Sequence, residues 1–232
     1  MKKLIPLFIA FFTLFSCSMR IDGSLAANGS ANFNVRMSLE PGITTLLQRL
    51  FAAGGQSGTP ILDGPSISRS MANAPGVASV SFRNTSGSAI EGQIRVTRIN
   101  DFLAATDGSR FITIEQRGAG SRLTINIDRA KSPLILAMLS EEIVDYLNAL
   151  MAPIATGEEL EKNEYLDLVA SFYNRNISNE IASSRIRASI EFPGAITSVR
   201  GGTFSGRSAS FDIPLLDLLV LETPLVYEVN WN

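Results

Sequence analysis

The acidic side chains of this chain could carry out acid–base chemistry, because hydrolysis of a glycosidic bond needs only two carboxyl groups, one on each side of the bond. One group of acids lies where helices are expected to begin, and the positive end of the helix dipole is a sufficient reason for it. A second group lies on or beside expected strands, where pairing across the sheet with Arg20, Arg117 or Arg187 fits better than catalysis. We therefore give these acids no catalytic role. The first group is Glu141, Glu142, Glu158, Glu159 and Glu161, and the second is Asp22, Glu115, Asp128 and Glu191.

Other common catalytic groups are scarce in the sequence. The 232 residues include one cysteine and no histidine, which removes the usual general base near neutral pH, the common zinc ligand and the Ser-His-Asp triad. The sequence has no Gly-x-Ser-x-Gly turn for a serine nucleophile, and Ser205 in Phe204-Ser205-Gly206 fits a hairpin turn. We expect no catalytic residue, no metal site and no cofactor. The chain is predicted not to be an enzyme, and a carboxylate-dependent hydrolase remains the third functional hypothesis.

The single cysteine, Cys17, follows an N-terminal export signal. Lys2 and Lys3 precede an apolar stretch from Leu4 to Phe15, which has the length of a secretory signal, since a membrane-spanning helix needs roughly 20 apolar residues. The sequence Leu14-Phe15-Ser16-Cys17 resembles the lipobox of bacterial lipoproteins. The resemblance implies removal of residues 1–16, a diacylglyceryl thioether on Cys17 and an acyl group such as palmitate on its new amino group. The alternative is an ordinary cysteine in a secretory signal.

A lipid on Cys17 would hold residues 17–232, a single expected domain, at the cell envelope. Each buried methylene adds about 0.8 kcal/mol to membrane binding, so the attachment would be close to permanent. Ser18 stands where an aspartate would favour the inner membrane, and the lipoprotein resemblance therefore favours the outer membrane in a cell that has one. Removal of Lys2 and Lys3 changes the net charge from −2 to −4, which argues against a nucleic-acid partner. The expected partners are the membrane and a lipid or an envelope protein, and the sequence does not fix the oligomeric state.

The mature sequence predicts an α+β fold, in which a mostly antiparallel sheet of hairpins packs against helices. Alternation of apolar and polar residues is clearest from Ala31 to Leu39, which indicates a strand with one buried face. Breaks such as Asn28-Gly29 and Gly201-Gly202 separate neighbouring strands and fit hairpin turns. The other segments with this alternation are 80–82, 94–96, 112–114, 123–127, 186–192, 209–213 and 225–231.

A helical hairpin is expected over about 133–176, between the central strands and the last ones. Ser132-Pro133 has the residue types of an N-cap and first helical position, and apolar residues then recur every three or four positions. Pro153 forces a turn. Thr156 with Glu159 fits a capping box that begins the second helix.

A shorter helix is expected from Pro41 to about Ala53, with apolar residues at helical spacing. Gly54-Gly55 ends it. Residues 54–66 are rich in Gly, Pro and Ser and are predicted to form a mobile loop.

Both ends of the mature chain resemble the LppM-type lipoprotein domain. At the N-terminal end, a hairpin from Met19 to Leu39 begins almost at the lipidated cysteine. At the C-terminal end, the segment from Ile190 to Gly194 is followed by Gly201-Gly202 and Phe211. The resemblance implies an α+β fold of sheet and helices and a role in lipid binding at the cell envelope. This chain differs from the family in its helical hairpin and in lacking a membrane helix after the last strand.

An apolar run near the C-terminus is the candidate ligand-binding segment. The run from Pro214 to Leu221 contains Asp217 as its one charged residue and is too short to span a membrane. Four of its leucines could line the mouth of an apolar pocket or dip into a bilayer, or the run could be a buried connection that packs on the sheet. The leading hypothesis is a lipid-anchored, non-enzymatic module that binds a lipid or other amphiphile, and the alternative is a structural or assembly subunit that docks another envelope protein. The four leucines are Leu215, Leu216, Leu218 and Leu219.

Overall fold

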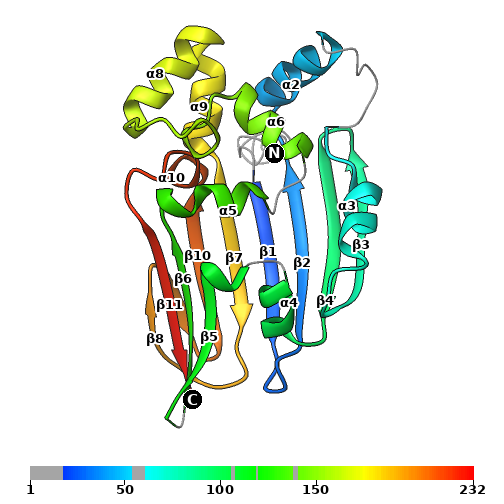
Figure 1. Ribbon diagram of the computed structural model, residues 1–232, viewed down its shortest axis with the longest axis vertical. Helices are drawn as coiled ribbons and strands as arrows, with labels where there is room; N and C mark the ends of the chain where they lie inside the picture. The colour runs from blue at the N-terminus through cyan, green and yellow to red at the C-terminus, as the bar shows by residue number, and fades with distance from the viewer. Residues whose placement is uncertain (1–17, 54–60, 106–107, 119, 138–140) are drawn as a thin grey trace, which may run out of the picture.

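The computed structural model describes residues 18–53, 61–105, 108–118, 120–137 and 141–232, and the structural statements below concern these residues. In these ranges the chain forms an α+β fold of two mostly antiparallel sheets and several short helices (Figure 1). The predicted fold class is confirmed. The export signal and Cys17 lie outside the described residues, so lipidation remains a prediction.

The larger sheet has seven strands in the order β3-β4-β2-β1-β7-β10-β9. Hairpins join β1 to β2 and β3 to β4, whereas β1 pairs in parallel with β7, which lies far along the chain. This parallel pair holds the N-terminal hairpin against the C-terminal strands. The strands are β1 (Ser18–Leu25), β2 (Ala31–Ser38), β3 (Val77–Ser86), β4 (Ala89–Val96), β7 (Arg185–Glu191), β9 (Thr203–Ser205) and β10 (Ser208–Pro214).

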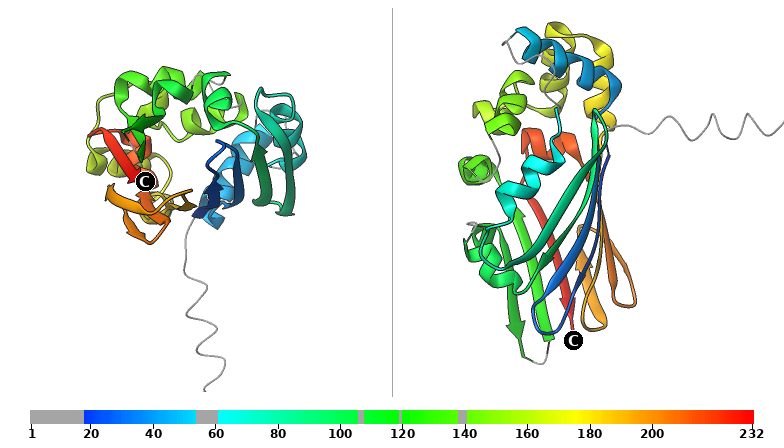
Figure 2. Two further views of the ribbon diagram at one scale, coloured as in Figure 1. Left: turned by 90° about the horizontal axis from the view of Figure 1, so that it is seen from below. Right: turned by 90° about the vertical axis from the view of Figure 1, so that its right-hand side faces the viewer.

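The smaller sheet has four strands in the order β5-β6-β11-β8, all paired antiparallel. Seen from below, the strands of both sheets follow a curved path around one side of the molecule, and helices lie across the other side (Figure 2). Apolar side chains of the smaller sheet and of β7 and β10 pack in one core, and those of β2, β3 and β4 pack in a second. The strands are β5 (Ile112–Arg117), β6 (Gly120–Ile127), β8 (Ile196–Arg200) and β11 (Leu225–Trp231).

The helices are shorter and more numerous than the sequence predicts. Helices occupy the region from about 133 to 176, as predicted, but its described residues form the short helices α5 to α8 and the start of α9 in place of two longer ones. Helix α7 ends after one turn at Gly157, which has the left-handed backbone that glycine tolerates. The capping box predicted at Thr156 lies instead at Glu161, whose backbone N–H donates to Glu164 Oε2 at 2.9 Å. The helices are α2 (Pro41–Ala53), α3 (Gly64–Met71), α4 (Ile99–Ala105), α5 (Ser132–Ala137), α6 (Glu141–Ala149), α7 (Pro153–Thr156), α8 (Lys162–Phe172), α9 (Arg175–Ser183) and α10 (Leu215–Val220), with short 3-10 turns at Gly108–Arg110 and Arg129–Lys131.

The larger apolar core lies between β7 and β10, the smaller sheet and the helices α2 and α6 to α10. The rings of Phe192 and Trp231 lie 4.8 Å apart, and those of Phe211 and Tyr227 meet edge to face at 5.6 Å. Tyr165 of α8 is fully buried in this core. Burial of large side chains contributes about 1.5–3 kcal/mol each, so this core accounts for much of the stability of the fold.

A smaller core forms where α3 covers β2, β3 and β4. Leu62 and Phe82 are buried in it, and Asn84 of β3 accepts a hydrogen bond from the Gly64 backbone N–H at 3.0 Å. The predicted mobile loop at 54–66 is wrong for residues 61–66, because the side chains of Ile61 and Leu62 are buried and α3 begins at Gly64. Residues 54–60 lie outside the described residues.

Three tyrosines predict a loss of stability in alkali. Burial raises the pKa of Tyr165, Tyr173 and Tyr227 above the usual value of about 10. The Tyr165 hydroxyl donates to the Leu150 carbonyl at 3.0 Å, and the Tyr173 hydroxyl donates to the Ala149 carbonyl. Because the unfolded chain releases these protons more readily, the free energy of unfolding should be fully retained below pH of about 10 and fall as the pH rises above it. Urea unfolding between neutral pH and pH of about 11 measures this.

A matched variant separates the phenol proton from the ring. Tyr165→Phe should lower the free energy of unfolding at neutral pH by about 1 kcal/mol, because the Leu150 carbonyl loses its donor. The decline above pH of about 10 should become shallower in this variant. Ionisation of all tyrosines near pH 10 in the folded protein, followed by ultraviolet absorbance, would contradict the assignment.

Candidate functional site

The register of the larger sheet gathers arginines on its outer face, the side away from the apolar cores. Ile21 of β1 faces Val35 of β2, so the intervening Arg20 points outward. Arg20 lies directly opposite Arg36 on β2 and directly opposite Arg187 on β7. We call these three residues, Arg36, Arg20 and Arg187, the arginine row. Their side chains are 70%, 62% and 52% exposed.

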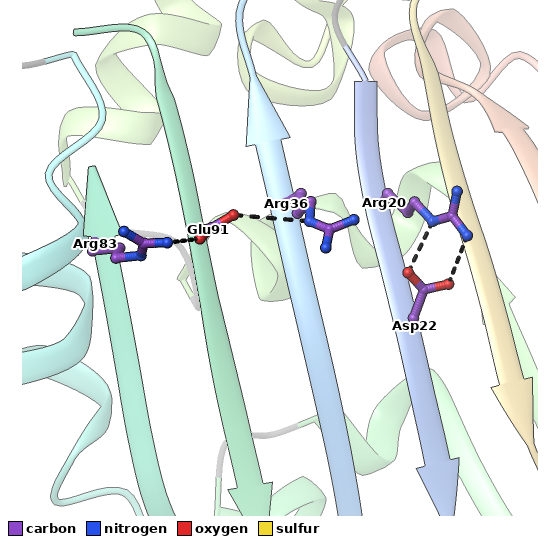
Figure 3. Close-up of polar contacts among 5 residues, drawn as sticks. All are labelled: Arg20, Asp22, Arg36, Arg83 and Glu91. Atoms are coloured by element: carbon purple, nitrogen blue, oxygen red, sulfur yellow. Dashed lines mark hydrogen bonds and ion pairs between the residues drawn. The ribbon is translucent and has the colours of Figure 1, made fainter. Parts of the chain in front are cut away.

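Acidic residues flank the arginine row but do not lie within it (Figure 3). Arg20 donates from Nε to Asp22 Oδ2 at 2.8 Å, and this hydrogen bond raises the pKa of the guanidinium, which stays charged. Arg36 Nε lies 3.9 Å from Glu91 Oε2, and Glu91 also pairs with Arg83. Arg187 Nε lies 3.8 Å from Asp212 Oδ1. Arg36 therefore has the longest of these three separations and shares its acid with a second arginine.

Like charges directly opposite each other destabilise a sheet, and neighbouring strands are only about 4.8 Å apart. Each of the three arginines also has an acidic neighbour, because Glu91 lies directly opposite Arg36, Asp212 lies directly opposite Arg187 and Asp22 accepts from Arg20, so these acids offset part of the repulsion. Guanidinium groups present several N–H donors in a plane and bind phosphate and carboxylate groups in bidentate fashion. The arginine row has the chemistry to bind a ligand with more than one negative charge.

The outer face is hollowed on both sides of the β1–β2 pair. A pocket of about 560 Å³ lies over β1, β7 and β10, bounded by the Gly201–Thr203 connection. It combines Arg20 and Arg187 with hydroxyl groups, and we call it the outer pocket. A second pocket of about 360 Å³ lies over β2, β3 and β4 and includes Arg36. The polar side chains of the outer pocket are Arg20, Asp22, Arg187, Ser189, Thr203, Ser210 and Asp212.

The leucines predicted from the C-terminal run lie elsewhere. They form α10, where Leu219 is buried, while Leu215, Leu216 and Leu218 are half-buried and pack against the larger core. Asp217 pairs with Lys162 of α8 at 2.9 Å. The two outer-face pockets and a third of about 430 Å³, at the end of the sheets near Trp231, are lined by other residues. The run has the contacts of a packed connection, which was one of its three interpretations.

The acids predicted to lie on or beside strands all have cationic partners. Asp22 pairs with Arg20 and Glu115 with Arg117, as expected, although each pair lies within one strand rather than across the sheet. Asp128 pairs with Lys131 at 2.8 Å, and the Lys131 hydrogen bond lowers the pKa of Asp128. The fourth acid, Glu191, pairs with Arg207 instead of Arg187. These acids lack the apolar surroundings that a catalytic proton donor needs.

Of the acids predicted at helix starts, Glu141, Glu142 and Glu161 lie at such positions, whereas Glu158 and Glu159 lie in the connection between α7 and α8. Glu158 and Glu159 are exposed ahead of α8, and Glu161 is its first cap residue. Glu141 and Glu142 begin α6, and their side chains lie outside the described part of the structure. Ser205 is the exposed last residue of β9, directly before a turn at Gly206.

In the described part of the chain, no cluster of three or more histidine, cysteine, aspartate or glutamate residues is arranged to hold a metal ion. The helices of the described residues are also all too short or too polar to cross a membrane.

The sequence alone did not reveal the arginine row. Arg20, Arg36 and Arg187 each occupy a polar position of an alternating strand, which is the signal that could have placed them on an outward face. Their juxtaposition also requires the parallel pairing of β1 with β7, and no local pattern predicts it.

No family model matches the sequence, and no curated protein matches it. Among solved structures, the folded domain of the LppM protein of Mycobacterium tuberculosis, determined by NMR, is similar to this chain. The TM-score is 0.45, with 10% sequence identity over 94% of this chain and 90% of that one. This is the kind of domain that the two ends of the sequence resemble.

Proposed function

We propose that the protein is a lipid-anchored, non-enzymatic module of the cell envelope that binds the anionic head group of an amphiphile at the arginine row. The observation that carries the proposal is the direct opposition of Arg36, Arg20 and Arg187 on three consecutive strands. A bound phosphate or carboxylate group would remove the repulsion among them and accept their N–H groups.

The position of the arginine row in the chain supports a ligand at the membrane surface. Arg20 follows Cys17 by three residues, and three residues of extended chain span at most roughly 10–11 Å. A lipid on Cys17 would thus hold the arginine row within reach of neighbouring head groups. Anionic lipids attract arginine and lysine near the membrane surface over about one Debye length.

Vesicle binding tests the proposal. Acyl-free protein with Cys17 replaced by serine should bind phosphatidylcholine vesicles that contain phosphatidylglycerol and should not bind vesicles of phosphatidylcholine alone. Binding should weaken as salt is added, because exposed charges are screened. Arg187→Gln should weaken binding about tenfold through loss of a charge-assisted hydrogen bond. Competition by soluble glycerol phosphate would distinguish head-group recognition from general attraction to a charged surface.

The matched control is Arg117→Gln. Like Arg187, Arg117 is exposed and pairs with an acid, in this case Glu115, but it lies on β5 of the smaller sheet. It should leave binding unchanged. Equal losses in the two variants, or binding that ignores the anionic lipid, would count against a site at the arginine row.

Docking of an envelope protein is a second candidate, favoured by the exposed Phe204. This side chain is 46% exposed on β9, which forms one edge of the larger sheet. Exposed edge strands can pair with a strand of another chain. A photo-crosslinker at Phe204 should then capture a discrete envelope partner in cells, and crosslinks to lipid or to none would remove this candidate.

A further inference from the structure

Three helices gather at the end of the molecule where the described chain begins. Ser18 pairs with Ser38, the last residue of β2, and with Arg185, the first residue of β7. Helix α2 follows β2, and α9 directly precedes β7, with α8 packed against α9. Figures 1 and 2 show α2, α8 and α9 together beyond this end of the sheet. The segment that contains Cys17 therefore joins the fold beside these helices.

Two exposed apolar side chains lie at the far ends of these helices. Phe172, the last residue of α8, is 68% exposed, and Leu50 of α2 is 38% exposed. Each continues the buried side of its helix by one turn, because Val169 and Leu47 stand three residues earlier and are buried. The apolar side of each helix thus extends past the core that covers the rest of it.

Exposed cations accompany these apolar side chains. Arg49 precedes Leu50, and Arg175 follows Phe172 at the start of α9. The acids of α8, Glu164 and the exposed Asp167, lie eight and five residues before Phe172. Apolar side chains bordered by arginine are typical of protein surfaces that lie in the membrane interface, where the arginines meet lipid phosphates.

We infer that this end of the molecule, formed by the last turns of α2 and α8 and the start of α9, contacts the membrane surface, with Phe172 and Leu50 in the interfacial layer. The inference rests on the proposed function in one respect, which is that a lipid on Cys17 holds this end at the membrane. The point of chain entry beside these helices and the positive charge of Arg49 and Arg175 favour a bilayer as the occupant.

The dimensions are compatible with this contact. Helix α9 has nine residues and rises about 13 Å from the level of Ser184 to its start. One head-group layer is roughly 5–8 Å deep, and interfacial side chains enter the acyl boundary by about 5–10 Å. Phe172 can therefore reach this boundary while Ser18 remains close to the membrane surface.

A fluorescent reporter beside Phe172 tests the inference in the lipidated full chain. Lipid on Cys17 blocks the one native thiol, so a Ser171→Cys substitution gives a unique site for an environment-sensitive dye. In vesicles of phosphatidylcholine alone, a nitroxide carried on the lipid should quench this dye several-fold more than a dye at Ala27→Cys. Ala27 is an exposed residue in the turn between β1 and β2, at the opposite end of the sheet.

When Phe172→Ser is introduced into the Ser171→Cys protein, quenching of the dye at position 171 should fall to the level seen at position 27. Phe172→Leu in the same protein should retain most of the quenching. A Ser171 reporter that is as open to aqueous iodide as the Ala27 reporter would overturn the inference. Burial of the reporter without vesicles would also overturn it, because a second copy of the chain would then be the occupant. The vesicles contain no anionic lipid, so failure of head-group binding at the arginine row leaves this result unaffected. Intact mass of the protein reports separately on lipidation of Cys17.

Discussion

Replacement of Arg36 with glutamine is expected to weaken binding to phosphatidylglycerol vesicles about tenfold while leaving the fold as stable as before, or more stable. Arg36 lies directly opposite Arg20, and its acidic neighbour Glu91 is 3.9 Å away and retains Arg83 as a partner. An exposed pair of this kind contributes less than about 1 kcal/mol, so its loss is offset by removal of the repulsion between two arginines. Vesicle cosedimentation and urea unfolding of the same preparations measure both effects.

Arg95→Gln is the matched control for this prediction. Arg95 is an exposed arginine on the same face, but it lies opposite Asn32 and Ser79. Its replacement should change neither the affinity for vesicles nor the free energy of unfolding appreciably. A clear loss of stability in Arg36→Gln, with affinity unchanged, would mean that the arginine row supports the sheet and does not bind an anion.

In Arg36→Gln, the affinity for vesicles should fall while the free energy of unfolding stays the same or rises. Replacement of a residue that supports the fold lowers the stability of the fold. A residue retained for binding can itself destabilise the fold, so its replacement need not lower stability. The outer face also has neutral polar side chains, such as those of Asn34 and Ser189, so outward positions of this sheet do not need a charge. The stability of the sheet therefore does not require three arginines in one row.

Strand positions were largely predictable because alternation is a local property of the chain. Both β2 and β11 have apolar residues at every second position, and the structure buries those positions fully or partly. The strands β8 and β9 were missed because they are short and mostly exposed, so they leave little apolar pattern. Helix α9 was missed for a related reason. Most of its residues are polar, and Ile177 and Ile181 are the two large apolar side chains on its buried side.

The site was less predictable than the fold because it depends on contacts between distant segments. The outward direction of each arginine follows from strand alternation, but the neighbour of β1 does not. Pairing of β1 with β7 in parallel encloses most of the chain, and its register is set by the packing of the whole interior. The C-terminal leucine run shows the converse, because an apolar pattern alone does not distinguish a packed helix from a ligand pocket.

Glu180 is expected to be the most important single charge for the end of the molecule that bears α2. Its carboxylate accepts hydrogen bonds from the backbone N–H groups of Gly42 at 3.0 Å and Ile43 at 2.8 Å. These N–H groups belong to the first turn of α2, which has no acidic residue of its own. A Cβ atom at Gly42 would lie 2.6 Å from a Glu180 carboxylate oxygen, so glycine is needed for this close approach. Helix α9 thus supplies both the cap and the negative charge for the start of α2.

Glu180→Ala should lower the free energy of unfolding by about 2–3 kcal/mol, because two half-buried N–H groups lose a charged acceptor. Hydrogen exchange should rise first in α2, since the substitution removes its connection to α9. Glu164→Ala is the matched control, because Glu164 caps its own helix at an exposed position and should cost under about 1 kcal/mol. If α2 exchanges no faster in Glu180→Ala than in Glu164→Ala, then the apolar contacts of Ile43 and Leu47 hold the helix without this cap. The expected result instead makes Glu180 the residue that holds the start of α2 against α9.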